Sequence, residues 1–464
     1  MMRLLRSVTQ ARLGLRAAVT AAVVAAVATG SFAAGVQAVS RPALPLLPGR
    51  ASLPGMDGHW VDTWVAAPQL TEPGNMPPPP FTGASSVFTD STIRQTLRVT
   101  IGGQQLRLRF SNAYGGTDLP ITAVSVARPA GGQAGVSAIQ PGTTQAVTFD
   151  GQPGVDIPVG AQAVADPLNF PVTAGSNLTV TMYLAAGQAS TSITSHPGSR
   201  TTTYMVNGNH LNDTDLATVA GVQSVAHWYF ISGAEVWASP AAAGAAVIGD
   251  SLTDGRGSDT NGNDRWTDDL FNRMHASPGT GSLSVLNQGL GGNRILNDGL
   301  GPNVLARLDR DVLAQSGVKW LIVWEGVNDI GTADATPDAQ KQVADELIAA
   351  YQQIITRAHA MGMKVYGATI TPFGGNNLYD DTAGLRNNVT RQTVNDWIRT
   401  SHQFDAVLDF DQVVRDPANP GQILPAYDSG DHLHLNPAGY QAIASSIPLS
   451  LFRQAPLPGT FGFH

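Results

Sequence analysis

Two short blocks, far apart in the sequence, carry residues that could perform nucleophilic catalysis. Residues 249–252 read Gly-Asp-Ser-Leu and follow a short apolar run, so Ser251 is expected where a strand passes into a helix. Backbone N–H groups and the helix dipole at such a junction favour developing negative charge. Near the C-terminus, residues 431–434 read Asp-His-Leu-His. A carboxylate three residues before a histidine can accept its Nδ1–H, so Asp431 could orient His434 and leave Nε2 free as a base.

Both blocks also have simpler interpretations. Ser251 could be a helix cap, and residues 431–434 could be a solvated polar loop. His432 and His434 could instead bind a metal ion. A strand would place both rings on one face, as a metal site requires, but the flanking Asp-Ser-Gly-Asp and Asn-Pro sequences favour a loop. No other histidine has obvious ligand spacing. We therefore predict no metal site, and acyl transfer from serine to water requires no cofactor.

Two further blocks contain groups that could stabilise an oxyanion. Residues 326–329 read Gly-Val-Asn-Asp just after the apolar run 320–324, and the Asn328 amide could donate to a negative charge there. Residues 289–293 read Gly-Leu-Gly-Gly-Asn, and a glycine N–H can approach a ligand closely because no side chain blocks it. Taken singly, each block is equally typical of a turn.

The elements that must position these residues follow an alternating pattern. Helical segments alternate with short apolar runs that we expect to be buried parallel strands, at 245–248, 284–286, 320–324, 365–368 and 406–410. The clearest helix lies at 336–362, with Thr-Pro-Asp at its start, a glycine at its end and apolar residues stepping by threes and fours. This pattern predicts an α/β layered domain over about residues 241–455. Ligands in such domains sit at the carboxyl ends of the strands, where three of the four blocks fall.

Residues 59–238 show a β pattern instead. The clearest segments, 93–101 and 106–110, alternate apolar and polar residues on either side of Gly102-Gly103. Because Gly-Gly supplies the positive φ angles that a tight turn needs, we expect a hairpin. Turn residues separate further short runs, which predicts a β-sandwich or jelly roll; these runs lie at 146–149, 178–184, 228–231 and 234–237.

The first 38 residues have the three-part pattern of a secretory signal peptide. They contain four arginines and no acidic residue, an Ala/Val run at 17–28, and small residues at Val36 and Ala38 before a cleavage point. The apolar run is too short to span a bilayer, so we predict a secreted, extracellular protein without a stable membrane anchor. An N-terminal membrane anchor is the alternative. Residues 39–58, with four prolines, are expected to form a flexible leader.

Composition excludes several classes of protein. The 464 residues include no cysteine, which removes cysteine nucleophiles, thiolate metal sites and disulfides. The chain has 27 basic and 35 acidic residues, a net charge of −8, and no Lys/Arg-rich run, so we expect no nucleic-acid partner. Loss of the signal peptide would remove four arginines and leave 23 basic against 35 acidic residues, or −12. That charge favours a neutral or cationic substrate surface over an anionic one.

Together and in this order, the four blocks resemble the SGNH branch of the GDSL esterases and lipases, over most of residues 245–440. The resemblance implies a flavodoxin-like three-layer α/β/α hydrolase domain. The preceding β-rich region is similar to the N-terminal part of exported actinobacterial members. In that family, Ser251 would be the nucleophile, His434 the base and Asp431 the residue that orients it.

The same resemblance implies an oxyanion hole formed by the backbone N–H groups of Ser251 and Gly292 and by the side chain of Asn328. Gly291 is the alternative one residue away. Gly292 is chosen because the family places its glycine two residues after an apolar one, which here is Leu290.

We therefore predict a secreted serine esterase that hydrolyses carboxylic esters through an acyl-enzyme intermediate. A xylan-type polysaccharide acetyl esterase is one alternative within the same class, and a phospholipase or lipase is another. The substrate could therefore be a small acyl ester, a lipid or an acetylated polysaccharide, and its acyl chain length and alcohol stay open. A carbohydrate-binding or adhesion protein with weak hydrolase activity is the alternative from another class. Trp60 or Trp64 could then stack on sugars, although tryptophans in alternating strands more often belong to a core. The sequence does not indicate the oligomeric state.

Overall fold

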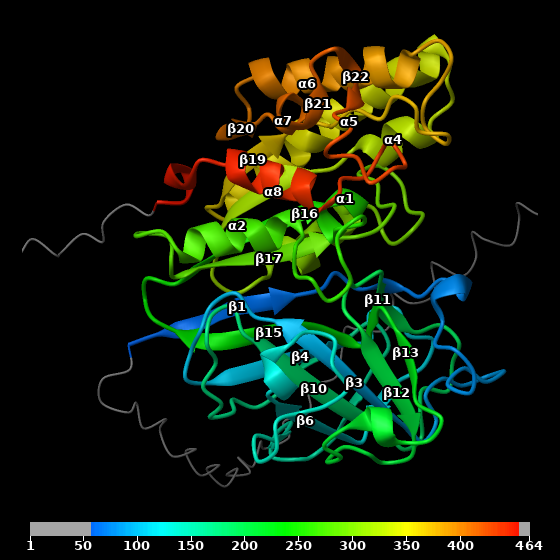
Figure 1. The fold of residues 1–464 in the computed structure, drawn as a ribbon, viewed down its shortest axis with the longest axis vertical. Helices are drawn as coiled ribbons and strands as arrows, with labels where there is room; N and C mark the ends of the chain where they lie inside the picture. The colour runs from blue at the N-terminus through cyan, green and yellow to red at the C-terminus, as the bar shows by residue number, and fades with distance from the viewer. Residues whose placement is uncertain (1–56, 454–464) are drawn as a thin grey trace, which may run out of the picture. The chain divides into compact units, whose positions relative to one another are not determined.

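The computed structural model describes residues 57–453 (Figure 1). The predicted signal peptide at 1–38 and residues 39–56 of the predicted leader lie outside the described residues. The buried hydrophobic residues of the described chain form two cores. One draws on residues from Val61 to Ala242, and the other draws on Val65 and on residues from Ala243 to Phe452. Among the helices of residues 57–453, none combines the length and the hydropathy that crossing a bilayer requires.

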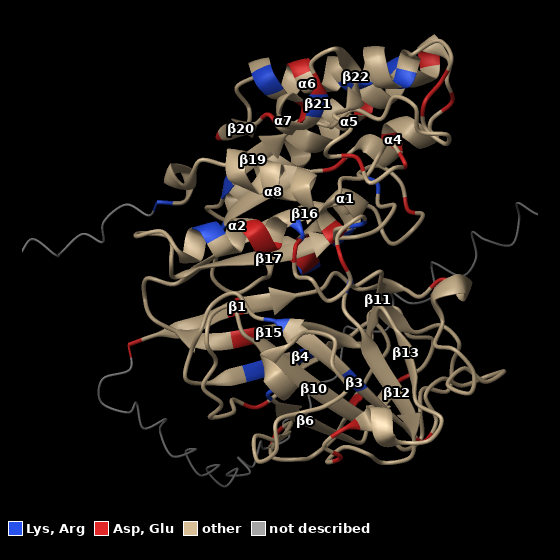
Figure 2. Ribbon diagram, viewed as in Figure 1, with Lys and Arg blue, Asp and Glu red and all other residues tan. Residues whose placement is uncertain are grey.

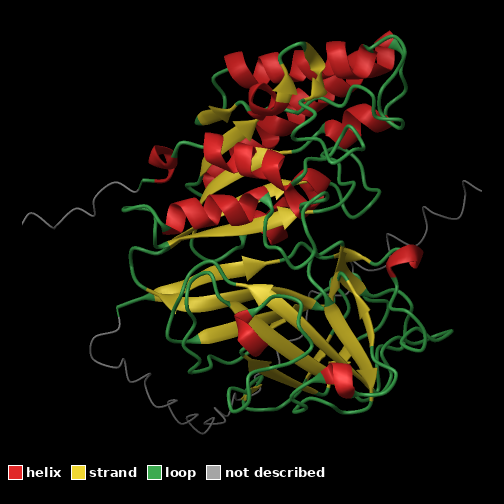
Figure 3. Cartoon of the chain, in the orientation of Figure 1, coloured by secondary structure: helices red, strands yellow, loops and turns green. Residues whose placement is uncertain are grey.

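The first core lies among antiparallel strands, which dominate the chain up to residue 238 (Figure 3). A four-stranded sheet has the order β1 (His59–Val65), β15 (Ile231–Ala238), β4 (Leu106–Ser111) and β9 (Gln162–Val164). A six-stranded sheet has the order β13 (Gln223–Val225), β12 (Thr203–Asn207), β3 (Ser91–Arg98), β10 (Asn177–Leu184), β6 (Ala123–Ala127) and β7 (Gln145–Val147). Smaller sheets join β14 (His227–Tyr229), β11 (Thr194–Pro197) and β2 (Gln69–Leu70), and pair β5 (Leu119–Ile121) with β8 (Val155–Ile157).

The hairpin expected around Gly102-Gly103 is wrong. Both strands exist, but β3 pairs with β10 and β12 while β4 pairs with β15 and β9, so the two strands belong to different sheets. Neither glycine has a positive φ angle. They are needed for close approach instead, since a Cβ on Gly102 would lie 2.6 Å from the Val172 carbonyl oxygen and one on Gly103 would lie 2.6 Å from that of Trp237.

The polar residues of β3 misled the sequence prediction because they are buried. Arg94 is fully buried, and its guanidinium donates to Thr181 Oγ1 at 3.0 Å and to the backbone carbonyls of Ser137 and Asp213 at 2.7 Å each. A polar residue with buried partners looks the same in the sequence as one that faces water. The alternation therefore did not mark an exposed face.

The second core surrounds a five-stranded parallel sheet. Its order is β17 (Leu283–Gly289), β16 (Ala243–Gly249), β18 (Val318–Trp324), β19 (Lys364–Ala368) and β20 (Ala406–Leu408). All five expected strands are present. The last is shorter than the apolar run suggested, because Asp409 caps a new helix that begins at Phe410.

Helices connect these strands. They are α1 (Ser251–Asp254), α2 (Trp266–His275), α3 (Val304–Leu308), α4 (Val327–Thr332), α5 (Pro337–Ala360), α6 (Arg391–Thr400), α7 (Phe410–Val414) and α8 (Pro437–Ser446), with a small pair β21 (Arg415–Asp416) and β22 (Asn419–Ile423). The expected long helix is confirmed as α5. Thr336 Oγ1 accepts from the Ala339 N–H at its start, and Gly362 adopts a positive φ of 74° just beyond its end.

The two halves of the described chain are joined by polar contacts. The Asp62 N–H donates to the Ser316 carbonyl at 3.1 Å, and the Ser316 N–H donates back to Asp62 Oδ2 at 2.7 Å. The Arg98 guanidinium in β3 lies 2.9 Å from the Asp268 carboxylate in α2. Strand β1 thus packs against β16 and β17 of the parallel sheet as well as pairing within its own sheet.

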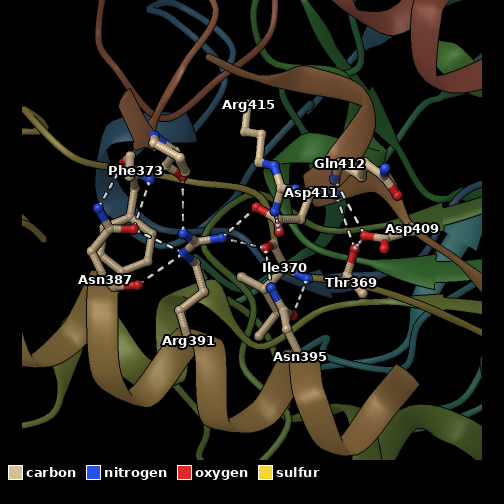
Figure 4. A network of polar contacts seen from close by, with 12 residues as sticks. Thr369, Ile370, Phe373, Asn387, Arg391, Asn395, Asp409, Asp411, Gln412 and Arg415 are labelled. Carbon is tan, nitrogen blue, oxygen red and sulfur yellow. Dashed lines mark hydrogen bonds and ion pairs between the residues drawn. The ribbon is translucent and has the colours of Figure 1, made fainter. Parts of the chain in front are cut away.

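A buried polar network fixes the chain that leaves β19 (Figure 4). Arg391 lies 2.6 Å from Asp411 Oδ1, and both side chains are inaccessible to solvent. Its Nε also donates to Asn387 Oδ1 at 2.8 Å. Asn395 binds both backbone groups of Ile370, at 2.7 and 2.8 Å. The network thereby anchors the start of a segment that later reaches the candidate site.

We expect Arg391→Met to lower the free energy of unfolding by about 3 kcal/mol, because it leaves the buried Asp411 carboxylate without its closest partner. Urea denaturation of the two proteins measures this difference. The control is Lys341→Met, which breaks the exposed Lys341–Asp345 pair and should change the unfolding midpoint little. Equal effects of the two substitutions would contradict the role of the network.

Candidate active site

The structure brings the three expected catalytic residues into one hydrogen-bonded line. Ser251 Oγ lies 2.8 Å from His434 Nε2, and His434 Nδ1 lies 2.6 Å from Asp431 Oδ2. Ser251 and His434 are both buried, although 183 residues separate them in the sequence. The arrangement can move a proton from the serine hydroxyl to the imidazole while the carboxylate orients the ring.

Local structure at the end of β16 presents Ser251. Asp250 caps the short helix α1 through its side chain, which accepts from the Leu252 N–H at 2.9 Å. Gly249 admits no side chain, since a Cβ there would lie 2.2 Å from Thr253 Oγ1. The serine therefore stands at the carboxyl end of a central parallel strand, as the sequence pattern predicted.

Asp431 is held as tightly as the histidine it binds. Its Oδ1 accepts from the backbone N–H groups of His434 at 2.8 Å and Leu433 at 3.1 Å, and its backbone carbonyl accepts from Asn376 Nδ2 at 2.8 Å. Burial alone would raise the pKa of Asp431, but the hydrogen bonds from the His434 ring and backbone hold that pKa well below its usual range. The carboxylate therefore stays ionised at neutral pH and can accept the Nδ1–H.

His432 is separate from this line. Its backbone adopts a φ of 62°, its side chain is half-exposed, and its Nδ1 lies 2.6 Å from Asp428 Oδ2. The two histidines of the His-X-His sequence thus have different carboxylate partners. In residues 57–453 no three His, Cys, Asp or Glu side chains come together in a way that could hold a metal ion.

The expected oxyanion donors gather beside Ser251. Asn328 Nδ2 donates to the Asn293 carbonyl at 2.7 Å, and Gly291 and Gly292 line the same cavity as Ser251 and Asn328. Gly292 has the positive φ, 72°. Within the described chain no acceptor lies in hydrogen-bond range of the N–H groups of Ser251, Gly291 or Gly292. These donors are free for a ligand.

The structure adds two residues that sequence reasoning missed. The Tyr379 hydroxyl donates to Asn328 Oδ1 at 2.6 Å. Asn376 Oδ1 accepts from the Tyr379 N–H at 3.0 Å, while its Nδ2 holds Asp431. A carbonyl on one side and a phenol on the other thus fix which way the Asn328 amide faces. No motif marks these residues, because the segment around them is simply rich in glycine and asparagine.

Arg307 ties together the strand ends beneath the site. This fully buried guanidinium donates to the carbonyls of Gly249 at 3.1 Å and Gln288 at 2.7 Å, and to Asn293 Oδ1 at 3.0 Å. Asp311 Oδ2 lies 3.2 Å away and balances its charge. The ends of β16 and β17 and the Gly-Gly-Asn turn are thereby fixed to one group.

Three of the buried acidic residues near the site have raised pKa values. Burial raises the pKa of Asp250 to about 7 and that of Asp329 to about 6, even though both accept backbone hydrogen bonds. Burial, reinforced by the nearby Asp250 charge, raises the pKa of Glu325 well above its usual range. Neither oxygen of Glu325 has a hydrogen-bond partner among the described residues.

A cavity of about 740 Å³ opens over the catalytic line. Both halves of the chain line it. The β-rich half contributes Gln69, Glu72, Asn75, Pro197, Gly198, Arg200 and His227. Most of the lining side chains are polar. Trp60 and Trp64 are not among the lining residues: Trp64 is buried against Trp228 with ring centres 4.9 Å apart, and the Trp60 ring lies 4.3 Å from the Arg107 guanidinium.

Comparison with known proteins agrees with this geometry. Residues 247–442 match the model of the GDSL-like lipase/acylhydrolase family, and this range contains Ser251, Asp431 and His434. This part of the chain belongs to that family. The protein is accordingly a carboxylic ester hydrolase with a GDSL-type domain and a β-rich N-terminal region. No curated protein matches the chain.

Similar solved structures cover less than half of this chain. A protein of the G-D-S-L lipolytic family from Desulfitobacterium hafniense is 21% identical, with 44% of this chain and 96% of that chain covered and a TM-score of 0.33. A GDSL-like lipase from Bacteroides thetaiotaomicron is 16% identical over 44% and 84%, with a TM-score of 0.31. An acetylxylan esterase from Geobacillus stearothermophilus is 18% identical over 44% and 91%, with a TM-score of 0.33. Similarity this low says nothing about the substrate of this chain.

The buried acids predict an unusual dependence of stability on pH. Because folding raises their pKa values, the folded state binds more protons than the unfolded state, so stability should fall as pH rises from about 4, where unfolded carboxyls ionise. Glu325→Gln keeps the shape and removes the charge. We expect it to be more stable than the wild type at pH 8 and similar at pH 5, measured by urea denaturation. Glu346→Gln on the exposed face of α5 is the control and should follow the wild type. Parallel pH curves for Glu325→Gln and the wild type would contradict the prediction.

Proposed function

We propose that the protein hydrolyses carboxylic esters through an acyl-enzyme intermediate on Ser251. The observation that carries this proposal is the 2.8 Å contact between Ser251 Oγ and His434 Nε2, with the other ring nitrogen 2.6 Å from Asp431. A serine hydroxyl is a weak nucleophile until an adjacent base takes its proton. The contact supplies that base in the required orientation.

In the first half of the reaction, Ser251 Oγ attacks the ester carbon while His434 Nε2 accepts its proton. The resulting tetrahedral intermediate collapses, the bond to the alcohol breaks, and the imidazolium gives the proton to the leaving oxygen. In the second half, water attacks the acyl-enzyme with its proton passing to His434, and Ser251 is released with the acid. Asp431 stabilises the imidazolium in both halves.

We propose that the oxyanion is bound by the N–H groups of Ser251 and Gly292 and by Asn328 Nδ2. One hydrogen of the Asn328 amide goes to the Asn293 carbonyl, which leaves the second for the substrate. Tyr379 is a positioning residue in this scheme, because its hydroxyl occupies Asn328 Oδ1 and keeps the nitrogen toward the site. Preorganised donors of this kind favour the transition state over the ground state.

We also propose a flavodoxin-like three-layer arrangement for the hydrolase domain and a β-sandwich for the region before it. The strand order β17-β16-β18-β19-β20 supports the first, and the two larger antiparallel sheets support the second. Export to the extracellular space is a further proposal, supported by the signal-peptide pattern of residues 1–38 alone. Because most of the side chains that line the cavity are polar, we propose that the ester substrate carries polar groups.

A serine-directed organophosphorus probe tests the nucleophile. We expect stoichiometric labelling and loss of hydrolysis of p-nitrophenyl acetate in the wild type, and neither labelling nor activity in Ser251→Ala. Ser239→Ala, on an exposed loop, is the control and should behave as the wild type. Labelling of Ser251→Ala, or activity that survives the substitution, would overturn the proposal. A series of p-nitrophenyl esters beside acetylated xylan would then define the acyl and alcohol preference.

Substitutions at Asn328 and Tyr379 test the oxyanion assignment. Asn328→Ala should lower kcat by ~10²–10³, the usual effect of removing one such donor. Tyr379→Phe keeps the ring but frees the amide, and should lower kcat about tenfold, the effect of one hydrogen bond, with KM little changed. Tyr204→Phe, which removes a hydroxyl bound to the Gly135 carbonyl in the β-rich half, should keep wild-type kinetics. Wild-type kcat in Asn328→Ala would show that the donor assignment is wrong.

A further inference from the structure

Two arginines from different halves of the chain line the catalytic cavity. Arg200 lies between β11 and β12, and Arg256 follows α1 five residues after Ser251. The Arg200 side chain is half-buried and its Nε is inaccessible, whereas Arg256 is exposed at the cavity. Two positive charges from distant parts of the sequence therefore meet the same space as the nucleophile.

Neither guanidinium has a protein partner. Across residues 57–453, no hydrogen bond, ion pair or ring contact involves the side chain of Arg200 or Arg256. Every other arginine in that range makes at least one such contact, with the exception of Arg453 at its end. The arginines without partners are thus concentrated at the active site.

The carboxylates that line the cavity are already engaged. Glu72 accepts from Gln69 Nε2 on one oxygen and from Asn75 Nδ2 at 2.9 Å on the other. Asp254 Oδ1 lies 2.9 Å from His196 Nε2, and Asp431 holds His434. Each of these carboxylates thus has at least one oxygen held by a neighbouring side chain. Asp254 Oδ2 accepts no hydrogen bond among the described residues.

Hydrogen bonds hold the backbone of both arginines in place. The Arg200 carbonyl accepts from the Asn261 N–H at 2.8 Å, and its φ of 53° is one that few side chains adopt. The Arg256 N–H donates to the Ser251 carbonyl at 2.9 Å, and its own carbonyl accepts from the Tyr440 hydroxyl at 2.6 Å. The main chain is anchored at both positions, so only the side chains need to order when a ligand binds.

We propose that Arg200 and Arg256 bind an anionic group, a carboxylate or sulfate, carried by the ester substrate. The inference rests on the proposed function and names the chemistry of its substrate. A guanidinium presents planar N–H donors that match carboxylate and sulfate oxygens, and an unpaired guanidinium in a partly desolvated cavity gains most from such a partner.

The net charge of the chain favours a neutral or cationic substrate, whereas the arginines that line the cavity favour an anionic one. The chain is acidic as a whole, and acidic and basic side chains are interspersed along it (Figure 2). Charges more than about 10 Å apart are largely screened in physiological salt, so the groups that line the cavity decide what binds there. Within the described chain, the positively charged side chains that line the cavity without a hydrogen-bonded partner are those of Arg200 and Arg256.

Matched ester pairs test the proposal. 4-Acetoxybenzoate and 4-acetoxybenzamide carry the same acetyl ester with and without a carboxylate on the alcohol side, and mono-p-nitrophenyl succinate and p-nitrophenyl butyrate do so on the acyl side. We expect Arg200→Gln and Arg256→Gln to raise KM about tenfold or more for the charged member of at least one pair, with KM for its neutral partner unchanged. The pair that responds shows on which side of the ester bond the anion lies.

Three controls make the result decisive. Arg200→Lys keeps the charge and should retain most of the preference. Arg453→Gln removes an arginine whose side chain has no partner among residues 57–453 and does not line the cavity, and should change nothing. Added salt should weaken only the charged substrates.

Failure of this inference differs from failure of the proposed function. If no member of any pair is hydrolysed, or if Ser251→Ala hydrolyses the esters as well as the wild type, the proposed function is wrong. If they are hydrolysed in a Ser251-dependent way but both arginine variants affect charged and neutral members equally, or affect neither, the esterase stands and the anion site is wrong.

Discussion

A single buried guanidinium holds together the chain segments that carry the expected oxyanion donors. Arg307 binds the last carbonyl of β16, the end of β17 and the side chain of Asn293. Parallel strands that end at one edge leave carbonyl groups without strand partners, and a buried carbonyl needs a donor. Arg307 supplies several donors at once. The geometry around Ser251 and Gly292 therefore depends on a residue that does not line the cavity.

Buried backbone N–H groups need acceptors, which explains why Asp250 and Asp329 are buried beneath the site. Asp250 caps α1, and Asp329 accepts from the Ile295 and Leu296 N–H groups at 2.9 and 3.0 Å, which fixes the turn after the glycines. Each acid performs a structural task at a cost in desolvation, visible in its raised pKa. Glu325 accepts no hydrogen bond in the described chain and is the least accommodated of the three.

Much of the hydrolase half could be predicted from the sequence because its signals are local. Apolar runs of five or so residues followed by a helix mark parallel strands, and a carboxylate three residues before a histidine already has the spacing of its hydrogen bond. The hairpin around Gly102-Gly103 could not be predicted correctly, since the partners of β3 and β4 come from residues more than 50 positions away. Tyr379 was missed for a related reason: its contact with Asn328 depends on how a loop without regular structure crosses the sheet edge, and no sequence period encodes that path.

The segment from Asn376 to Tyr379 has two attachments, one to Asp431 and one to Asn328. The same segment thus holds Asp431 and Asn328, which lie far apart in the sequence. Displacement of this segment would release the Asp431 backbone carbonyl and the Asn328 side chain together. The positions of Asp431 and Asn328 are therefore coupled through the four residues from Asn376 to Tyr379.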